Sequence, residues 1–115
     1  MQIRIIKEPI TRGELAKIAQ EGFGDLVKGV VDIEKEILAL GAELHSDEEA
    51  LLLQNGSKQN NLWGINLYPS KYGEDFVEFD SVINLRPSEG NFSRAVDNPQ
   101  IQRKILEIVK RLIKD

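Results

Sequence analysis

Residues 26–45, LVKGVVDIEKEILALGAELH, decide the fold because two kinds of secondary structure compete for them. Apolar residues spaced i, i+4, i+7 and i+11 would form a helix stripe, whereas apolar residues at every second position would form a strand face. The first set is Ile33, Ile37, Leu40 and Leu44, and the second is Leu38, Leu40, Ala42 and Leu44. The β-branched residues of 27–33 favour a strand, and Gly41 would weaken a helix interior by about 1 kcal/mol relative to alanine. We therefore predict a hairpin that turns near Glu34–Lys35.

The segment before this hairpin predicts a strand followed by a helix. Residues 2–7, QIRIIK, are rich in β-branched isoleucine, and Pro9 ends the strand. Thr11 and Glu14 have the spacing of a capping box, in which each side chain accepts a hydrogen bond from the backbone amide of the other. The helix that starts there is predicted to end at Gly22–Gly24.

The segment after the hairpin, SDEEALLLQNG (46–56), predicts a second helix. Ser46 and Glu49 again have capping-box spacing. Asn55–Gly56 is typical of a helix end, although the same dipeptide is also typical of a hairpin turn. Of these two interpretations we keep the helix.

Two more strands and a last helix complete the chain. NLWGINLYP (61–69) and FVEFDSVINLRP (76–87) alternate apolar and polar residues, which is typical of an antiparallel sheet covered on one side. The long loop of 87–99 ends in Asn98–Pro99, which fits the first positions of a helix with an apolar stripe over 101–112. The predicted order is βαββαββα: a single α+β domain over residues 1–115, with a mainly antiparallel sheet of about five strands and two to three helices.

The composition narrows the classes of partner and chemistry. A net charge of −4 and a pI of about 5.1 disfavour nucleic acid and an anionic membrane as partners. The chain has no cysteine, which excludes disulfides, thiol catalysis and thiolate metal sites. No apolar run approaches the ~20 residues of a membrane span, and the first residues lack a signal-peptide core. A soluble, cytoplasmic protein is therefore expected.

Charge is unevenly distributed along the chain. Residues 32–50 hold seven acids and one lysine, a net charge of −6, whereas residues 101–115 hold five bases and two acids, a net charge of +3. Two solvated faces explain this pattern most simply. Alternatively, the two segments lie near each other or bind a charged partner.

The only histidine, His45, stands among acids. In an extended strand Glu43 and His45 would share a face, and an aspartate from a neighbouring strand would complete a metal or acid–base site. Alternatively, Ser46 is an N-cap and the acids at 47–49 complement the helix dipole, which requires no chemistry. The second interpretation explains more of these residues, so we predict no metal site.

A second group of polar residues lies on the last two predicted strands and in the loop after them. Asparagine has poor strand propensity, so asparagines on a strand face indicate a hydrogen-bonding role. An arginine fork binds carboxylate or phosphate with two hydrogen bonds. A solvated polar face is the plainer alternative. The candidate ligand-binding residues of the two groups are Glu43, His45, Asn66, Asp80, Asn84, Arg86, Asn91 and Arg94.

Three patterns in the chain carry a resemblance to a known family. They are GxELHxD (41–47), LWGxNxYP (62–69) and NxRPxxGNxSRxV (84–96). Through them the chain resembles a family of small bacterial and archaeal proteins that is classed only as a domain of unknown function. The resemblance spans most of the chain and implies a stand-alone prokaryotic protein, with no established activity, catalytic residue or cofactor.

Two functions from different classes remain open. The first is a non-enzymatic interaction or regulatory module that pairs with itself or with a protein partner, suggested by the charge asymmetry and the amphipathic last helix. The alternative is a small hydrolase or a metal- or anion-binding protein with a polar site around His45, Asp80, Arg86 and Arg94. In that version the arginines hold an anion, and His45, oriented by Glu43 or Asp80, acts as general base.

Overall fold

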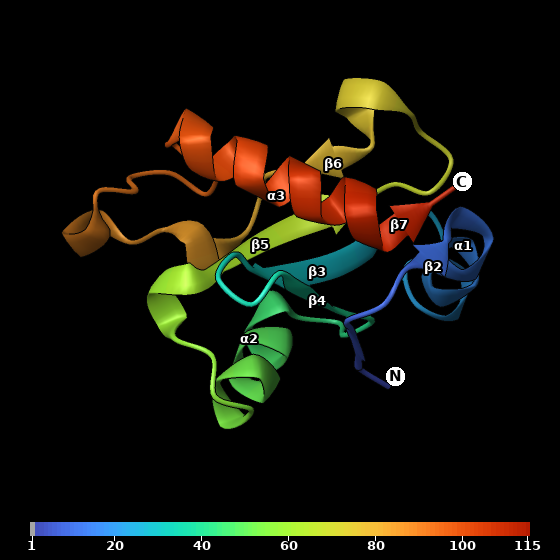
Figure 1. The fold of residues 1–115 in the computed structure, drawn as a ribbon, viewed down its shortest axis with the longest axis horizontal. Coiled ribbons are helices and arrows are strands. Elements are labelled where there is room, and N and C mark those ends of the chain that lie inside the picture. Colours follow the sequence, from blue (N-terminus) through green and yellow to red (C-terminus); the bar gives the residue numbers. More distant parts are fainter. Residues whose placement is uncertain (1) are drawn as a thin grey trace.

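An antiparallel sheet of five strands forms the middle layer of the protein, which the computed structural model describes over residues 2–115 (Figure 1). The strands lie in the order β1-β4-β3-β5-β6. Their bounds are Arg4–Ile6 for β1, Val27–Asp32 for β3, Ile37–Leu40 for β4, Leu62–Leu67 for β5 and Val77–Glu78 for β6. Two further short strands, β2 (Ile10–Thr11) and β7 (Ile113–Lys114), pair in parallel. The predicted α+β class and the order of the main elements are confirmed.

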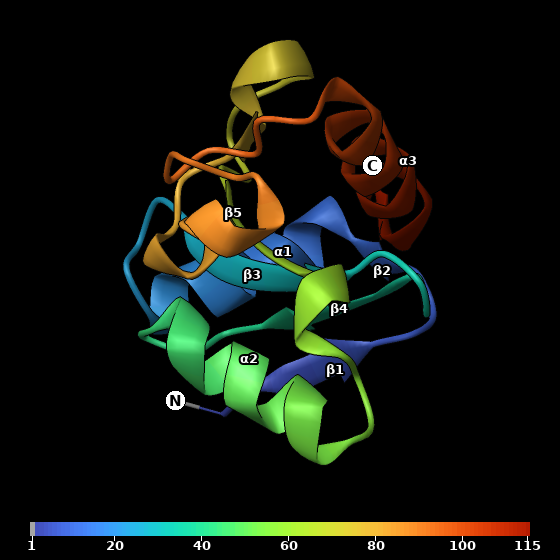
Figure 2. The ribbon, with the colours of Figure 1, turned by 90° about the vertical axis from the view of Figure 1, so that its left-hand side faces the viewer.

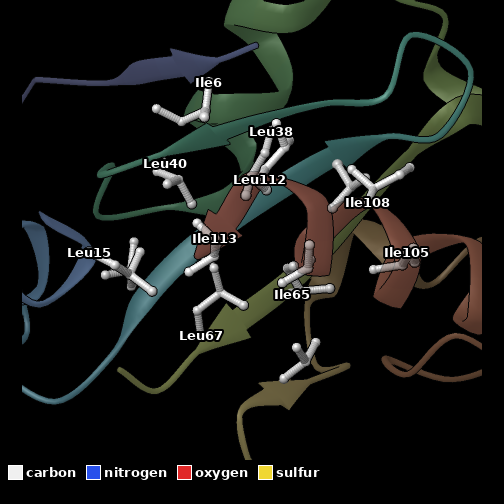
Figure 3. Packing of buried hydrophobic residues seen from close by; sticks show 14 of the residues in the cluster. Ile6, Leu15, Leu38, Leu40, Ile65, Leu67, Ile105, Ile108, Leu112 and Ile113 are labelled. Carbon is white, nitrogen blue, oxygen red and sulfur yellow. The ribbon is translucent and has the colours of Figure 1, made fainter. Parts of the chain in front are cut away.

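Helices cover both faces of the sheet (Figure 2). The helices α1 (Arg12–Glu21) and α3 (Pro99–Leu112) pack on one face, and α2 (His45–Gln54) packs on the other. The main core lies beneath α1 and α3, where leucine and isoleucine side chains from helices and sheet interdigitate (Figure 3). Its fully buried members include Leu15, Leu38, Leu40, Ile65, Leu67, Ile105 and Leu112. A smaller cluster beneath α2 contains Val30, Ala39, Leu52 and Leu62.

The predicted hairpin is confirmed, because β3 and β4 pair antiparallel and turn between Asp32 and Ile37. The Asp32 carboxylate fixes the turn by accepting hydrogen bonds from the backbone amides of Glu34 and Lys35, both at 2.9 Å. The same carboxylate accepts the hydroxyl of Ser57 at 2.6 Å. Asp32 is therefore occupied by the turn.

The second strand of the hairpin ends at Leu40, so the prediction that Glu43 and His45 share a strand face is wrong. Gly41 has a φ of +103°, a conformation that disfavours residues with a Cβ atom. A Cβ atom at this position would also lie only 2.8 Å from the carbonyl oxygen of Gln2. The chain turns at this glycine, and His45 becomes the first residue of α2.

The helix starts follow the predictions in two cases of three. The capping box of Thr11 and Glu14 is formed, and Asn98 accepts the amide of Gln100 at 2.8 Å at the start of α3. The helix at 46–56 is confirmed, with Asn55 as its C-cap, but its predicted capping box is wrong. Helix α2 begins one residue earlier than Ser46, with Leu44 at the N-cap position and no side-chain cap, and its first turn buries His45 and Glu48.

The oppositely charged segments do lie near each other. The Glu36 carboxylate forms one ion pair with Lys104 at 3.2 Å and a second with Arg111 at 3.6 Å. Both pairs connect the hairpin turn to α3 across the surface. Part of the charge asymmetry is therefore neutralised within the protein. In the described part of the chain, every helix is too short or too polar to cross a lipid bilayer.

The predicted strand over 76–87 is largely wrong, since β6 contains only Val77–Glu78. Two 3₁₀ turns follow, at Val82–Asn84 and Pro87–Glu89. Side chains of this segment bond the backbone of β5 in place of a further strand, and the chain packs closely over β5, since a Cβ atom on Gly64 would lie 2.5 Å from the Cβ of Ser81. The expected polar face of residues 78–86 is therefore not formed as a strand face.

Candidate functional site

The eight predicted site residues separate into two groups and one exception. His45, Asn66, Asp80 and Arg94 line a single open cleft of about 440 Å³. Asn84, Arg86 and Asn91 are buried and bind backbone groups instead. Glu43 is exposed and does not line the cleft. Half of the residues predicted from the sequence therefore lie together in this cleft.

The cleft lies on the same face of the sheet as α2, and residues from the start of that helix and from the segment that follows β6 line it. Its floor is a row of side chains across three neighbouring strands: Lys28 of β3 lies opposite Asn66 of β5, which lies opposite Glu78 of β6. Apolar side chains form part of its wall, namely Leu26, Leu44, Val82 and Ile83. The strand register therefore fixes which polar groups meet in the cleft.

Asn66 is the centre of this row and is only 7% exposed. Its amide nitrogen donates to the Glu78 carboxylate at 2.8 Å and to the carbonyl oxygen of Asp80 at 3.2 Å. Both partners are acceptors, so the orientation of the amide is fixed. Its Oδ1 atom is buried and has no hydrogen-bond partner among residues 2–115. Buried polar atoms without a partner are rare in folded proteins, and this one borders the cleft.

His45 reaches the floor of the cleft from the first turn of α2. Its Nε2 atom lies 2.9 Å from the carbonyl oxygen of Ile65. A carbonyl oxygen can only accept, so Nε2 carries the proton and Nδ1 is the acceptor nitrogen of the neutral ring. Burial lowers the pKa of His45 below its usual value, against the opposing effects of the Ile65 carbonyl and the Asn66 side chain. The lowered pKa leaves the imidazole neutral at pH 7, and its side chain lines the cleft together with Asn66.

Arg94 and Asp80 form an ion pair at the rim, with 2.7 Å between Nε and Oδ1. Both side chains are about half exposed, so the pair adds little to the stability of the fold. The backbone of Arg94 is fixed more firmly than its side chain, because its carbonyl oxygen accepts from the amide of Ser81 and from the side chain of Asn84. The rim therefore offers an arginine whose charge is already balanced by Asp80.

Asn84, Arg86 and Asn91 hold the segment after β6 against the edge of β5. Asn84 accepts from the amide of Gly64 at 2.8 Å and donates to its carbonyl oxygen at 2.9 Å, as a neighbouring strand would. Arg86 donates to the carbonyl oxygens of Gln59 and Leu62 at 2.7 and 2.9 Å, and its guanidinium lies 4.0 Å from the centre of the Trp63 ring.

Asn91 completes this arrangement from within the loop. Its amide nitrogen donates to the carbonyl oxygens of Asn84, Ser93 and Ala95, at 2.7 to 3.1 Å. Its side-chain oxygen accepts from the amide of Asp97 at 2.8 Å. The pattern NxRPxxGNxSR thus builds the support of the cleft wall, and only its Arg94 lines the cleft.

Sequence reasoning missed Lys28, Glu78 and Glu48. Lys28 is a charged residue in an otherwise apolar strand, VKGVV, and that contrast was the available signal. Glu48 was assigned to the helix dipole, yet it is fully buried and accepts from the amide of Ala42 at 3.0 Å. Burial raises the pKa of Glu48 to about 9, so this acid is protonated at neutral pH. Its spacing from His45 and Leu52, which share its helix face, could have predicted its burial.

Across residues 2–115, no three histidine, aspartate or glutamate side chains come together in an arrangement that could hold a metal ion. The set of Glu43, His45 and an aspartate is therefore not assembled.

Comparison with known proteins gives one family match. A family model described as "Protein of unknown function (DUF5674)" matches residues 4–112. The matched range begins with β1 and ends with α3, so it includes the whole five-stranded sheet and all residues that line the cleft. No curated protein and no solved structure matches the chain.

Proposed function

Because the chain belongs to the DUF5674 family of proteins of unknown function, its activity has to be inferred from its own site, and we propose that it binds a small polar molecule in the cleft beside His45. Small-molecule sites are concave and largely apolar, with a few polar groups that fix the orientation of the ligand. The cleft combines an apolar wall with polar groups from three strands and one helix.

One observation carries this proposal: the floor of the cleft holds hydrogen-bonding capacity that the fold leaves unused. The Oδ1 atom of Asn66 has no partner, although Asn66 is more than nine-tenths buried. The His45 imidazole, whose pKa burial lowers and the Asn66 side chain raises, lines the same cleft. Leaving a buried acceptor without a partner costs about 1–3 kcal/mol, and a ligand with N–H or O–H donors would recover part of that free energy.

The hydrolase version of this site loses part of its support. It required Arg86 to hold an anion, but the Arg86 guanidinium is bound to two backbone carbonyls and covers Trp63. It also used Glu43, which lies outside the cleft. Arg94 and His45 remain in place. We therefore propose binding at this site and assign no reaction to it.

The interaction module also loses part of the features that suggested it. Lys104 and Arg111 pair with Glu36, and the apolar stripe of α3 is buried in the main core. Self-association and a protein partner stay predictions that these intramolecular contacts do not test.

The test of ligand binding uses a variant that fills the cleft without disturbing the core. Val82 lines the cleft and is 64% exposed, so Val82→Trp is expected to fold normally and to block the space. Thermal-shift measurements on the unmodified protein, with nucleotides, phosphosugars, carboxylic acids, amines and amino acids, are expected to give at least one concentration-dependent rise in Tm. The same compound is expected to give no shift with Val82→Trp. His45→Gln, which keeps a donor for the Ile65 carbonyl, is expected to weaken the shift.

Leu85→Trp is the matched control, because Leu85 is exposed in the same segment but does not line the cleft. It is expected to keep the full shift. A compound that stabilises Val82→Trp as strongly as the unmodified protein binds elsewhere. If every stabilising compound behaves in that way, or if none stabilises the protein, the proposal is wrong.

A further inference from the structure

We propose that the ligand of the cleft is a zwitterion with an apolar group, as in a free α-amino acid with an aliphatic side chain. This inference rests on the proposed binding function and specifies the chemistry of the ligand. It follows from the charges that remain unbalanced in the cleft once the internal ion pair is set aside.

The charges of the cleft cancel overall but are separated in space. Arg94 and Asp80 balance each other at 2.7 Å. Lys28 and Glu78 remain, and they stand on either side of Asn66 in the cross-strand row. Directly opposed residues on neighbouring strands have Cβ atoms about 5 Å apart, so the Cβ atoms of Lys28 and Glu78 are roughly 10 Å apart. Their flexible side chains have to converge above Asn66 to meet the ammonium and carboxylate of an α-amino acid, which share one carbon. The floor thus presents a positive and a negative group on either side of the free Oδ1 atom of Asn66.

Lys28 is a half-buried cation with no ion pair among the described residues, and its ammonium lies 5.1 Å from the centre of the Phe23 ring. Glu78 accepts from Asn66 and from the Tyr68 hydroxyl, at 2.8 and 3.0 Å, through one carboxylate oxygen only. Neither neutral donor cancels its charge. A ligand carboxylate beside Lys28 and a ligand ammonium beside Glu78 would balance both charges at once.

Ligands with charge of one sign fit this arrangement less well. A phosphate would neutralise Lys28 but would leave Glu78 without a counter-charge and bring a second anion towards it, in a cleft whose two positive and two negative side chains sum to zero. A simple amine would satisfy Glu78 and the acceptors but would leave Lys28 unpaired. Like charges brought together in an interface cost several kcal/mol, which favours a ligand that carries both signs.

The apolar wall explains the remaining part of the ligand. Leu44 and Val82 line the cleft and are 54% and 64% exposed, so they offer apolar surface that the fold does not cover. Burial of such surface contributes about 25 cal/mol per Å². An aliphatic side chain extending from the zwitterion would cover both residues.

The experiment compares leucine with two analogues that keep its branched apolar end and each lack one charged group. 3-Methylbutylamine keeps the ammonium, and 4-methylpentanoate keeps the carboxylate. Isothermal titration calorimetry on the full chain is expected to give a Kd for leucine at least tenfold lower than for either analogue. Lys28→Met is expected to remove the advantage of leucine over the amine, and Glu78→Gln its advantage over the carboxylate. Lys110→Met, at an exposed lysine of α3 outside the cleft, is the matched control and is expected to change neither ratio.

The outcomes separate this inference from the binding function on which it rests. If 4-methylpentanoate or inorganic phosphate binds as tightly as leucine and Val82→Trp abolishes that binding, the cleft is a ligand site but the zwitterion is wrong. The same conclusion follows if leucine binds equally well to Lys28→Met and Glu78→Gln. If no probe binds in a way that Val82→Trp abolishes, both the inference and the proposed function fail.

Discussion

Replacing Asn84 with alanine is expected to lower the free energy of unfolding by about 4 kcal/mol, since each buried polar group left without a partner costs ~1–3 kcal/mol. The Asn84 side chain is fully buried and bonds the amide and the carbonyl oxygen of Gly64 and the carbonyl oxygen of Arg94. Alanine would leave the buried amide and carbonyl oxygen of Gly64 without a partner, whereas the Arg94 carbonyl oxygen would keep its hydrogen bond from the Ser81 amide. Because Asn84 also fixes the backbone that carries Arg94, the substitution would loosen one wall of the cleft.

Urea unfolding measures the change in stability, and hydrogen exchange locates it. The Gly64 amide is expected to exchange faster in Asn84→Ala than amides of β3 or β4, because its acceptor is a side chain and not a neighbouring strand. The matched control is Asn55→Ala, which removes one exposed hydrogen bond to the carbonyl oxygen of Leu51. The control is expected to cost less than ~1 kcal/mol. Equal losses in the two variants would show that Asn84 does not replace a strand at the edge of β5.

The second large effect is expected from Glu48→Gln. The gain in unfolding free energy of this variant over the unmodified protein should be larger at pH 8 than at pH 5 by about 4 kcal/mol, at ~1.4 kcal/mol per pH unit. Burial raises the pKa of Glu48 from 4.5 to about 9. Below pH 4.5 the carboxyl is protonated in both states and the native state carries no cost. Between pH 4.5 and 9 the unfolded chain ionises while the folded protein does not, so stability falls as the pH rises.

Glutamine removes this titration and keeps an acceptor for the amide of Ala42. The difference in unfolding free energy between Glu48→Gln and the unmodified protein should therefore grow from pH 5 to pH 8. His45 titrates in the opposite sense, since a lowered pKa destabilises the fold as the pH falls, but it is present in both proteins and cancels. Glu49→Gln is the matched control: its pKa is also raised by burial, yet it is only partly buried, and a much smaller slope is expected. Parallel stability curves for Glu48→Gln and the unmodified protein would contradict a protonated, buried Glu48.

The fold could be predicted from the sequence wherever an element follows a simple period. The helix stripes, the caps at Thr11 and Asn98 and the hairpin within 26–45 are local patterns, and the structure has them all. The strand over 76–87 failed because its alternation is real but its polar residues bind backbone groups of β5 directly. No propensity scale can indicate that a side chain takes the place of a neighbouring strand.

The site could be predicted only in part, for a related reason. Asparagines on a strand did indicate hydrogen bonding, but Asn84 and Asn91 bind the protein's own backbone, whereas Asn66 faces the cleft. Which of these applies depends on contacts between residues distant in the sequence. Lys28 and Glu78 lie beside Asn66 because of the strand register, which the sequence patterns did not predict. The resemblance to a family of unknown function is confirmed by the match over 4–112, and a prokaryotic origin stays an expectation.

The most direct test of the account is a ¹H–¹⁵N correlation spectrum of the protein recorded during titration with leucine. A cleft site predicts saturable shifts that cluster at Lys28, His45, Asn66 and residues 80–83, with little change at the Arg12–Tyr72 contact. The same titration of Val82→Trp should leave these signals in place. Shifts centred on Arg12 and Tyr72, or cleft signals that do not move at saturating leucine or with any compound that raises Tm, would contradict the cleft as the functional site.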